Sequence, residues 1–375
     1  MDSNAPRKSV VLWLIVKNEV SVIERCLTSV RPFIDAWSIV DTGSTDGTQA
    51  KILELMSDLP GELHERPWVN FGHNRSEALE LARKWGDYAL LMDADDVFEI
   101  DPALDIESLK HTLSASYYHI DVKMSGIVFA RGGLTSTTKK FEYRGAVHEF
   151  LQAIDPVESP PRLDGLAYCY APGGARGQDP DKYKKDAIAI ENALAGEKDP
   201  FMVSRYTFYL AQSYRDSGQH EKAIATYEKR ATLGGFPDEV SIALMCAGHL
   251  RQLRKDDSAV IIDSYTRSWE AAPHRAEPLY YAAKFCREND RIKAAYLYIQ
   301  QARKIPTPAN GLFVEPSVYD WCIAYEYSIA AWYQNDFVAG LKSCYEVLGS
   351  PGLHEAEADT TRGNIGHYRR SLGLP

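Results

Sequence analysis

One stretch decides the fold of this chain: Tyr88-Ala89-Leu90-Leu91-Met92-Asp93-Ala94-Asp95-Asp96. A short apolar run that ends abruptly on acidic residues is typical of a buried strand followed by a polar turn. Similar apolar runs and runs with helical spacing of apolar residues occur before it, at residues 10–16, 20–30, 37–40, 49–56 and 76–84. This alternation predicts a mostly parallel, Rossmann-like α/β sheet with crossover helices.

A second polar stretch follows residues 37–40: Asp41-Thr42-Gly43-Ser44-Thr45-Asp46-Gly47-Thr48. Ligands of parallel sheets bind beyond the carboxyl ends of the strands, and both acidic stretches are predicted to lie there. Asp41, expected as the first residue past its strand, is placed to accept hydrogen bonds from a base or ribose. Glycines and capping Ser, Thr and Asp residues would equally form an ordinary strand-to-helix turn, so both interpretations stay open.

The carboxylates of Asp93, Asp95 and Asp96 repel one another unless a cation or hydrogen-bond donors satisfy them. Hard divalent ions prefer oxygen ligands and bridge readily to phosphates, so the cluster fits Mg²⁺ or Mn²⁺ holding a diphosphate. A helix N-cap or a solvated turn is the alternative for so short a motif. The strand predicted before it favours the metal site.

Two further segments carry candidate site residues. Arg75 lies at the start of a predicted helix, where its forked guanidinium suits phosphate oxygens, although a surface ion pair with Glu77 or Glu80 is equally consistent. His148 and Glu149 offer a metal ligand and a general base, with plain surface positions as the alternative. Adjacent residues of a strand point to opposite faces, so both serve one site only if the backbone turns there.

From about residue 180 the strand-like runs stop and apolar residues recur at helical spacing. Residues 204–237 and 278–306 share an order of large, small, aromatic and turn residues that is typical of the tetratricopeptide repeat, with its period of about 34 residues. We therefore predict an α/β domain over residues 8–175 and an all-α, tetratricopeptide-like domain over residues 180–375. A plain helical bundle is the alternative for the second domain.

The composition argues against several classes of partner and site. The 375 residues carry a formal net charge of −10, which argues against nucleic acid because such surfaces need clustered Lys and Arg. Six cysteines without a C-x-x-C pair indicate reduced thiols rather than a zinc site or disulfide framework. The apolar residues 10–16 are too few to span a bilayer, and no other run approaches ~18 apolar residues, so we expect a cytoplasmic protein without a transmembrane segment.

Together the N-terminal motifs resemble the family-two glycosyltransferases, which have the GT-A fold. Residues 14–19 look like the first strand and nucleotide-binding turn of that family. Residues 39–48 resemble its VVDDGSTDGT motif, with Thr42 in place of the second Asp. Residues 70–79 resemble the segment ahead of the metal motif, and residues 91–96 resemble its LDADD motif.

The second half of the chain resembles one subgroup of this family. Residues 205–235 look like the subgroup that fuses this catalytic domain to tetratricopeptide-like helices, which includes SunS-type peptide glycosyltransferases, and the pattern of residues 145–149 recurs there. Two departures stand out. No histidine occurs near residues 168–177, where such enzymes often carry a metal-contacting one, and no acceptor-binding motif is matched.

The resemblance implies a metal-dependent, inverting transfer from a nucleotide-diphosphate sugar, usually a UDP-sugar. The acceptor is not identified by the sequence, and a peptide, protein or glycan is expected. It implies that Asn18, Glu19 and Asp41 hold the base and ribose and that Asp93 contacts the ribose or the metal. Arg75 is expected on the donor phosphates.

For the chemistry, the resemblance implies that Asp95, together with Asp93 and His148, serves Mn²⁺ or Mg²⁺. Glu149 is the expected general base, and Asp96 is the competing candidate. The surface of the helical domain is predicted to contribute to acceptor binding or to homodimerisation.

Two other functions fit the sequence less well. A tetratricopeptide scaffold with a non-catalytic transferase-like domain has no chemical need for both Asp93 and Asp95, and the chain has both. A sugar-1-phosphate nucleotidyltransferase would show a glycine-rich, basic loop after the first strand, and residues 17–20 do not supply one.

Overall fold

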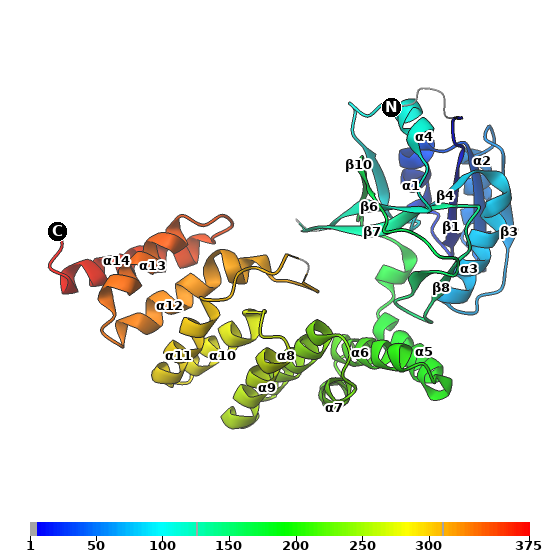
Figure 1. Ribbon diagram of the computed structural model, residues 1–375. Helices are drawn as coiled ribbons and strands as arrows, with labels where there is room; N and C mark the ends of the chain where they lie inside the picture. The colour runs from blue at the N-terminus through cyan, green and yellow to red at the C-terminus, as the bar shows by residue number, and fades with distance from the viewer. Residues whose placement is uncertain (1–5, 125–126, 310) are drawn as a thin grey trace. The chain divides into compact units, whose positions relative to one another are not determined.

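The computed structural model describes residues 6–124, 127–309 and 311–375. Within them the chain divides into two compact units, one ending at Ala193 and the other beginning at Leu194. Figure 1 shows strands and helices in the first unit and helices in the second. A mostly parallel α/β sheet followed by a tetratricopeptide-like helical region confirms the predicted fold class.

The N-terminal unit is built on a sheet that has eight strands in the described residues, in the order β3-β2-β1-β4-β7-β6-β10-β5. The four leading strands are parallel to one another, while β7 and β5 run against their neighbours. β8 and β9 form a separate antiparallel pair. The strand bounds are Val10–Val16 (β1), Ala36–Asp41 (β2), Gly61–Glu65 (β3), Tyr88–Leu91 (β4), Val97–Ile100 (β5), Tyr117–Met124 (β6), Ile127–Ser136 (β7), Phe141–Arg144 (β8), Phe150–Ala153 (β9) and Arg162–Cys169 (β10).

Helices cover both faces of the parallel part of the sheet. Their bounds, with three short 3₁₀ turns, are Ile23–Val30 (α1), Arg31–Phe33 (η1), Thr48–Leu55 (α2), Phe71–Ala82 (α3), Arg83–Trp85 (η2), Ile106–Thr112 (α4), Ala175–Gln178 (η3) and Lys182–Gly196 (α5). Successive residues of β1 point to opposite faces. Leu12 belongs to the core that includes Leu27 of α1 and Ile52 of α2, whereas Trp13 packs with Ala78 of α3.

Among the elements that differ from the sequence-based prediction are β3 and α3. β3 was not predicted, because it lies at the sheet edge and only His64 among its residues is buried, so it has no apolar run. α3 begins at Phe71 rather than at Ser76, because the Asn70 side chain caps it by accepting a hydrogen bond from the His73 N–H at 2.8 Å.

The C-terminal unit consists of helical hairpins in series (Figure 1). α6 packs on α7, α8 on α9, α10 on α11 and α12 on α13, and α14 closes the series against α12 and α13. The helix bounds, with one π-helical turn, are Pro200–Asp216 (α6), His220–Thr232 (α7), Pro237–Arg254 (α8), Ser258–Ala271 (α9), Glu277–Glu288 (α10), Ile292–Ala302 (α11), Val318–Cys322 (η4), Ile323–Trp332 (α12), Phe337–Leu348 (α13) and Glu355–Ser371 (α14). No helix in the described part is both long enough and apolar enough to cross a membrane.

Small residues at the predicted repeat positions let these helices approach closely. Ala211 and Ala223 are fully buried, and Tyr227 fills the adjoining space with no exposed surface. A Cβ on Gly248 of α8 would lie 2.8 Å from the Tyr265 ring of α9, so this contact requires glycine. The repeat pattern therefore reflects helix packing.

A buried charge cluster joins α8, α10 and the segment before η4. Arg275 and Glu277 are 0% exposed and Asp238 is 3% exposed, so all three charges lie out of water. Arg275 pairs with Asp238 at 3.2 Å and with Glu277 at 2.9 Å, and Glu277 also accepts from the Tyr319 hydroxyl. Buried charges are tolerated when paired in this way, and removing one partner leaves the others uncompensated.

We expect Arg275→Met to lower the free energy of unfolding of the C-terminal unit by about 3–5 kcal/mol, because two buried carboxylates lose their cation. Urea unfolding followed by far-UV circular dichroism measures the change. The control is Arg254→Met, since Arg254 is 37% exposed where it pairs with Asp256, and its loss should cost under ~1 kcal/mol. Equally small losses in both variants would contradict a stabilising role for the buried cluster.

Candidate functional site

The carboxyl ends of β2, β1 and β4 lie next to one another at one edge of the sheet, because β1 lies between the other two strands. Asp41 is the last residue of β2 rather than the first residue past it, since its backbone pairs with Val16 and Glu65. The arrangement brings the acidic stretches at residues 41–48 and 93–96 to the edge where ligands of parallel sheets bind.

The turn after β2 is fastened to the residues that follow β1. The Asn18 N–H donates to Ser44 Oγ and the Asn18 side-chain oxygen accepts from the Thr45 N–H, both at 2.8 Å. The Glu19 N–H donates to Thr48 Oγ1 at 2.8 Å. Asn18, expected on the base or ribose, therefore has its side-chain oxygen engaged in shaping this turn.

Asp41 has one satisfied oxygen and one that lacks a partner. Its Oδ1 accepts from the N–H groups of Gly43 and Ser44, both at 2.8 Å. Its Oδ2 is buried and forms no hydrogen bond within the described residues, although the side chain is only 1% exposed. A buried carboxylate oxygen without a donor is costly, so a ligand N–H or O–H would satisfy it.

Asp93, just past β4, is held between two arginines. Its Oδ1 accepts from Arg75 Nη2 at 2.5 Å and its Oδ2 from Arg131 Nη1 at 3.0 Å. Burial disfavours the carboxylate, but the two guanidinium charges outweigh burial and hold the pKa of Asp93 well below its usual range. Arg75 is 9% exposed, so it forms this buried pair instead of a surface pair with Glu77 or Glu80.

Arg131 on β7 is a site residue that the sequence analysis missed. Its Nη2 lies 3.3 Å from Asp96 Oδ2, and its guanidinium lies over the Tyr168 ring, 4.4 Å from the centroid. Burial first, and then the nearby Asp93, raise the pKa of Asp96 to about 7 despite the opposing charge of Arg131. The one signal for Arg131 was a charged residue inside a strand-like run at residues 127–136.

Asp95 is the member of the acidic cluster that forms no ion pair within the described residues. Its carboxylate lies against the segment after β10, where a Cβ on Gly174 would come within 2.6 Å of Asp95 Oδ2. Arg25 Nη2 ties this segment to the cluster by donating to the carbonyl oxygens of Asp95 and Ala171, both at 2.7 Å. Burial and then Asp93 raise the pKa of Asp95.

The described residues contain no group of three or more His, Cys, Asp or Glu side chains arranged to hold a metal ion. Both oxygens of Asp93 are engaged by arginines, whereas Asp95 keeps a hard oxygen donor beside the cluster. This donor fits Mg²⁺ or Mn²⁺ of the kind that takes one or two carboxylates and completes its shell with phosphate and water.

The turn between β8 and β9 places Glu149 beside the start of α3. The Gly72 N–H donates to the Gly145 carbonyl oxygen at 3.0 Å, and a Cβ on Gly72 would lie only 2.6 Å from that oxygen. Glu149 Oε1 lies 2.6 Å from Arg75 Nε, so Glu149 joins the Asp93 cluster through Arg75. The backbone turns at the His-Glu pair, because His148 has a φ angle of 55°. The His148 side chain is exposed.

Glu19 joins the same edge through the segment after β10. Its Oε2 accepts from the Ala175 N–H at 3.2 Å. Burial is the main effect on its carboxyl group, and the nearby Asp95 and Asp46 add to it, so the pKa of Glu19 rises to about 7.

Comparison with known proteins finds a family match over the part of the site that lies on β1, β2 and β4. Residues 12–109 match the model of glycosyl transferase family 2. An uncharacterized glycosyltransferase of Rickettsia bellii is 30% identical over 89 residues, which cover 24% of this chain and 28% of the relative. A TPR repeat-containing protein of Synechococcus elongatus is 30% identical over 105 residues, covering 28% of this chain and 25% of the relative. The matched segment thus spans about a quarter of the length of either relative.

Solved structures similar to this chain include tetratricopeptide proteins. YrrB, a TPR protein, is 16% identical with a TM-score of 0.38 and covers 50% of this chain and 85% of its own. BtubC of P. vanneervenii is 14% identical with a TM-score of 0.40 and covers 54% of this chain and 85% of its own.

The raised pKa of Glu19 predicts a pH dependence of stability. The folded state keeps the proton up to about pH 7, whereas the unfolded chain releases it near the ordinary value of 4.5. Between these values the folded state binds more protons, so its stability falls as the pH rises. We expect Glu19→Gln to reduce this fall, measured as the difference in Tm between about pH 5 and about pH 8.

The matched control for this measurement is Glu24→Gln, because the Glu24 side chain on α1 is 60% exposed. Its pH dependence should follow that of the unmodified protein. If Glu19→Gln also follows the unmodified protein, Glu19 does not hold a proton in the folded state near neutral pH.

Proposed function

We propose that this protein, whose N-terminal unit carries a glycosyl transferase family 2 domain, transfers a sugar from a nucleotide-diphosphate sugar to an acceptor. The single observation that carries the proposal is the Asp93 cluster. Two arginines fix Asp93 at the carboxyl end of β4, and the neighbouring Asp95 keeps its carboxylate without an ion pair within the described residues. A fixed acidic cluster at this edge of the sheet suits a metal-bound diphosphate.

The nucleoside of the donor would occupy the edge formed by β1 and β2. Asp41 Oδ2 is buried without a hydrogen-bond partner in the described residues, which supports a contact with an N–H of the base or a hydroxyl of the ribose. A UDP-sugar is the donor that we favour, by family resemblance. Asn18 would act by shaping the adjoining turn, since its side-chain oxygen accepts from Thr45.

Asp95 would hold Mn²⁺ or Mg²⁺, with Asp93 assigned to the ribose or the metal and His148 to the metal or the diphosphate. When bound, the divalent ion would supply positive charge that neutralises the diphosphate leaving group. The protein itself also supplies positive charge beside Asp93, through the buried guanidinium of Arg75. The Nη1 of Arg75 has no hydrogen-bond partner in the described residues. That free N–H supports a contact with donor phosphate.

The transfer would be a single displacement with inversion. The acceptor oxygen or sulfur attacks the anomeric carbon of the sugar, the bond from that carbon to the diphosphate oxygen breaks, and the nucleoside diphosphate leaves with the bonding electrons. The acceptor proton passes to a carboxylate of the protein. Positioning a general base in this way contributes typically ~10²–10⁴-fold to the rate.

Glu149 is the carboxylate that we assign to this step, because Arg75 holds one of its oxygens and its side chain remains 13% exposed. Asp96 is the competing base. Its pKa of about 7 suits proton transfer near neutral pH, but it is only 5% exposed and is engaged by Arg131.

The helical unit would bind a peptide, protein or glycan acceptor, or join two copies of the chain, in a protein that we expect to be cytoplasmic. The alternative is a tetratricopeptide scaffold with an inactive transferase domain. A scaffold has no use for an acidic cluster held by two arginines, one buried and one partly buried, which favours the enzyme.

We predict that Asp95→Ala lowers donor turnover by at least ~10²-fold while the fold survives, because the charge that offsets the leaving diphosphate is lost. Release of nucleoside diphosphate from UDP-sugars with Mn²⁺ measures turnover, and thermal unfolding measures the fold. Glu99→Ala is the control, since Glu99 lies nearby on β5 with a side chain that is 51% exposed. Full turnover by Asp95→Ala, or by the unmodified protein in EDTA, would reject the metal role.

We also predict that Glu149→Gln lowers the transfer rate by at least ~10²-fold and leaves nucleotide affinity nearly unchanged, because it removes the base but keeps the size of the side chain. Single-turnover kinetics give the rate, and calorimetric titration with UDP gives the affinity. Asp96→Asn is measured in parallel. A retained rate in Glu149→Gln with a lost rate in Asp96→Asn would transfer the role to Asp96, and a collapse of UDP binding would assign Glu149 to the donor site.

A further inference from the structure

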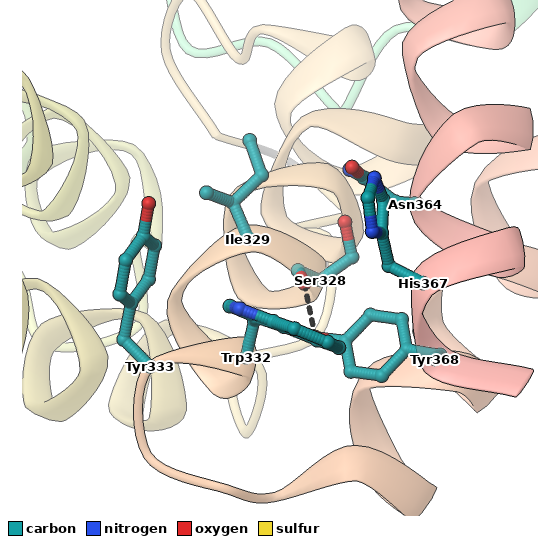
Figure 2. Close-up of a pocket in the computed structure, with 7 residues that line it drawn as sticks. All are labelled: Ser328, Ile329, Trp332, Tyr333, Asn364, His367 and Tyr368. Carbon is teal, nitrogen blue, oxygen red and sulfur yellow. Dashed lines mark hydrogen bonds between the residues drawn. The ribbon is translucent and has the colours of Figure 1, made fainter. Parts of the chain in front are cut away.

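A cleft of about 380 Å³ lies in the C-terminal unit between α12 and α14 (Figure 2). In Figure 2, Tyr333 stands on the opposite side of the cleft from Asn364 and His367, and Trp332 lies between them. Tyr333 is 60% exposed, whereas Tyr368 at the base of the cleft is 1% exposed. The volume is at the lower end of the range for small-molecule pockets, roughly 300–1,000 Å³, and suits a ligand of one or two six-membered rings.

The aromatic wall of this cleft is held rigidly. The Trp332 ring meets Tyr368 edge to face, with centroids 5.3 Å apart, and packs against Phe337 at 5.1 Å. The Tyr368 hydroxyl donates to the Ser328 carbonyl oxygen, so its position is fixed as well. A ligand that stacks on Trp332 would therefore find the ring already in place, which reduces the entropy cost of binding.

The polar side of the cleft offers neutral hydrogen-bonding groups. His367 Nδ1 lies 2.9 Å from Arg370 Nη2, and because a guanidinium only donates, Nδ1 must accept. The ring is then the neutral tautomer with its proton on Nε2, which can donate to a ligand. The Asn364 amide forms no hydrogen bond within the described residues, so it has both donors and an acceptor available.

These features select one class of ligand. Among the described residues, the side chains that line the cleft include no Asp, Glu, Lys or Arg, and the neighbouring Arg370 directs Nη2 at His367 Nδ1. The lining itself therefore offers no charged partner to a phosphate, an acidic peptide or a basic peptide. A purely apolar ligand would cover Asn364 and His367 and leave their polar groups unsatisfied. A pyranose ring matches both sides, because its C–H face is apolar and suits the negative face of an aromatic ring, while its rim carries hydroxyl groups.

We propose that the α12–α14 cleft is a carbohydrate-binding subsite for a neutral pyranose ring, stacked on Trp332 and hydrogen-bonded to Asn364 and His367. It goes beyond the proposed transferase function, because the cleft belongs to the helical unit and its chemistry needs neither the donor nor the metal. One ring held mainly by stacking is expected to bind with a Kd of about 1 mM.

Saturation-transfer NMR on the full chain tests the proposal without nucleotide-sugar or metal. The probes are methyl glycosides of glucose, galactose, mannose and N-acetylglucosamine, with cyclohexanol as an apolar ring that lacks the hydroxyl rim. We expect at least one glycoside to receive saturation, and Asn364→Ala and Trp332→Leu each to weaken its binding at least ~5-fold. Tyr345→Ala should leave binding unchanged, because Tyr345 is a 52% exposed aromatic residue on α13 outside the cleft.

The outcomes separate this subsite from the catalytic proposal. Asp95→Ala should keep glycoside binding, whatever it does to donor turnover. Trp332 packs against other side chains, so if Trp332→Leu fails to fold, Asn364→Ala decides alone. The proposal is overturned if no glycoside binds, or if Tyr345→Ala reduces glycoside binding as much as Asn364→Ala does. It is also overturned if cyclohexanol binds as well as the glycosides and Asn364→Ala changes the binding of neither probe.

Discussion

The ionised Asp93 is the constraint on which the candidate site depends. A partly buried carboxylate is stabilised by compensating charge, and here the charge comes from Arg75 on α3 and Arg131 on β7, which leave the Asp93 side chain 29% exposed. Arg75 also holds Glu149, and the β8–β9 turn that carries Glu149 approaches α3 closely enough to require glycine at Gly72. The charge of Asp93 and its partner Arg75 thus connect a strand end, a helix and a turn.

The parallel core could be predicted from the sequence because its strands are covered on both faces. Such strands appear as continuous apolar runs, as in β1, β2 and β4. β6 was not predicted, since buried and partly buried residues alternate along much of Tyr117–Met124 and the run is less conspicuous. The helical region was predictable because its hairpins repeat small residues at fixed spacing, as Ala211 and Ala223 illustrate.

A site residue could be predicted from the sequence only where its position along the chain, at the end of a strand or just after one, determines its place in the fold. Asp41 ends one strand, and Asp93 and Asp95 follow another, so their place at the ligand-binding edge of the sheet could be expected. Arg131 could not be assigned, because its role depends on β7 lying beside β4, a pairing between segments more than thirty residues apart. Asn18 was assigned to the base or ribose from its motif alone. In the structure its side-chain oxygen accepts a hydrogen bond from Thr45 in the turn after β2, a contact that the motif did not indicate.

The shared arginines also determine what a substitution in the cluster can reveal. Arg131 contacts both Asp93 and Asp96, so removing Asp93 leaves the buried Arg75 and the partly buried Arg131 with altered partners. Substitutions of contacting residues are not additive, and a loss of activity at Asp93 would mix catalysis with stability. Asp95 has no such ion pair within the described residues and can be replaced without leaving a buried arginine uncompensated. Its replacement therefore reports on the chemistry of the acidic cluster more directly than that of either neighbour.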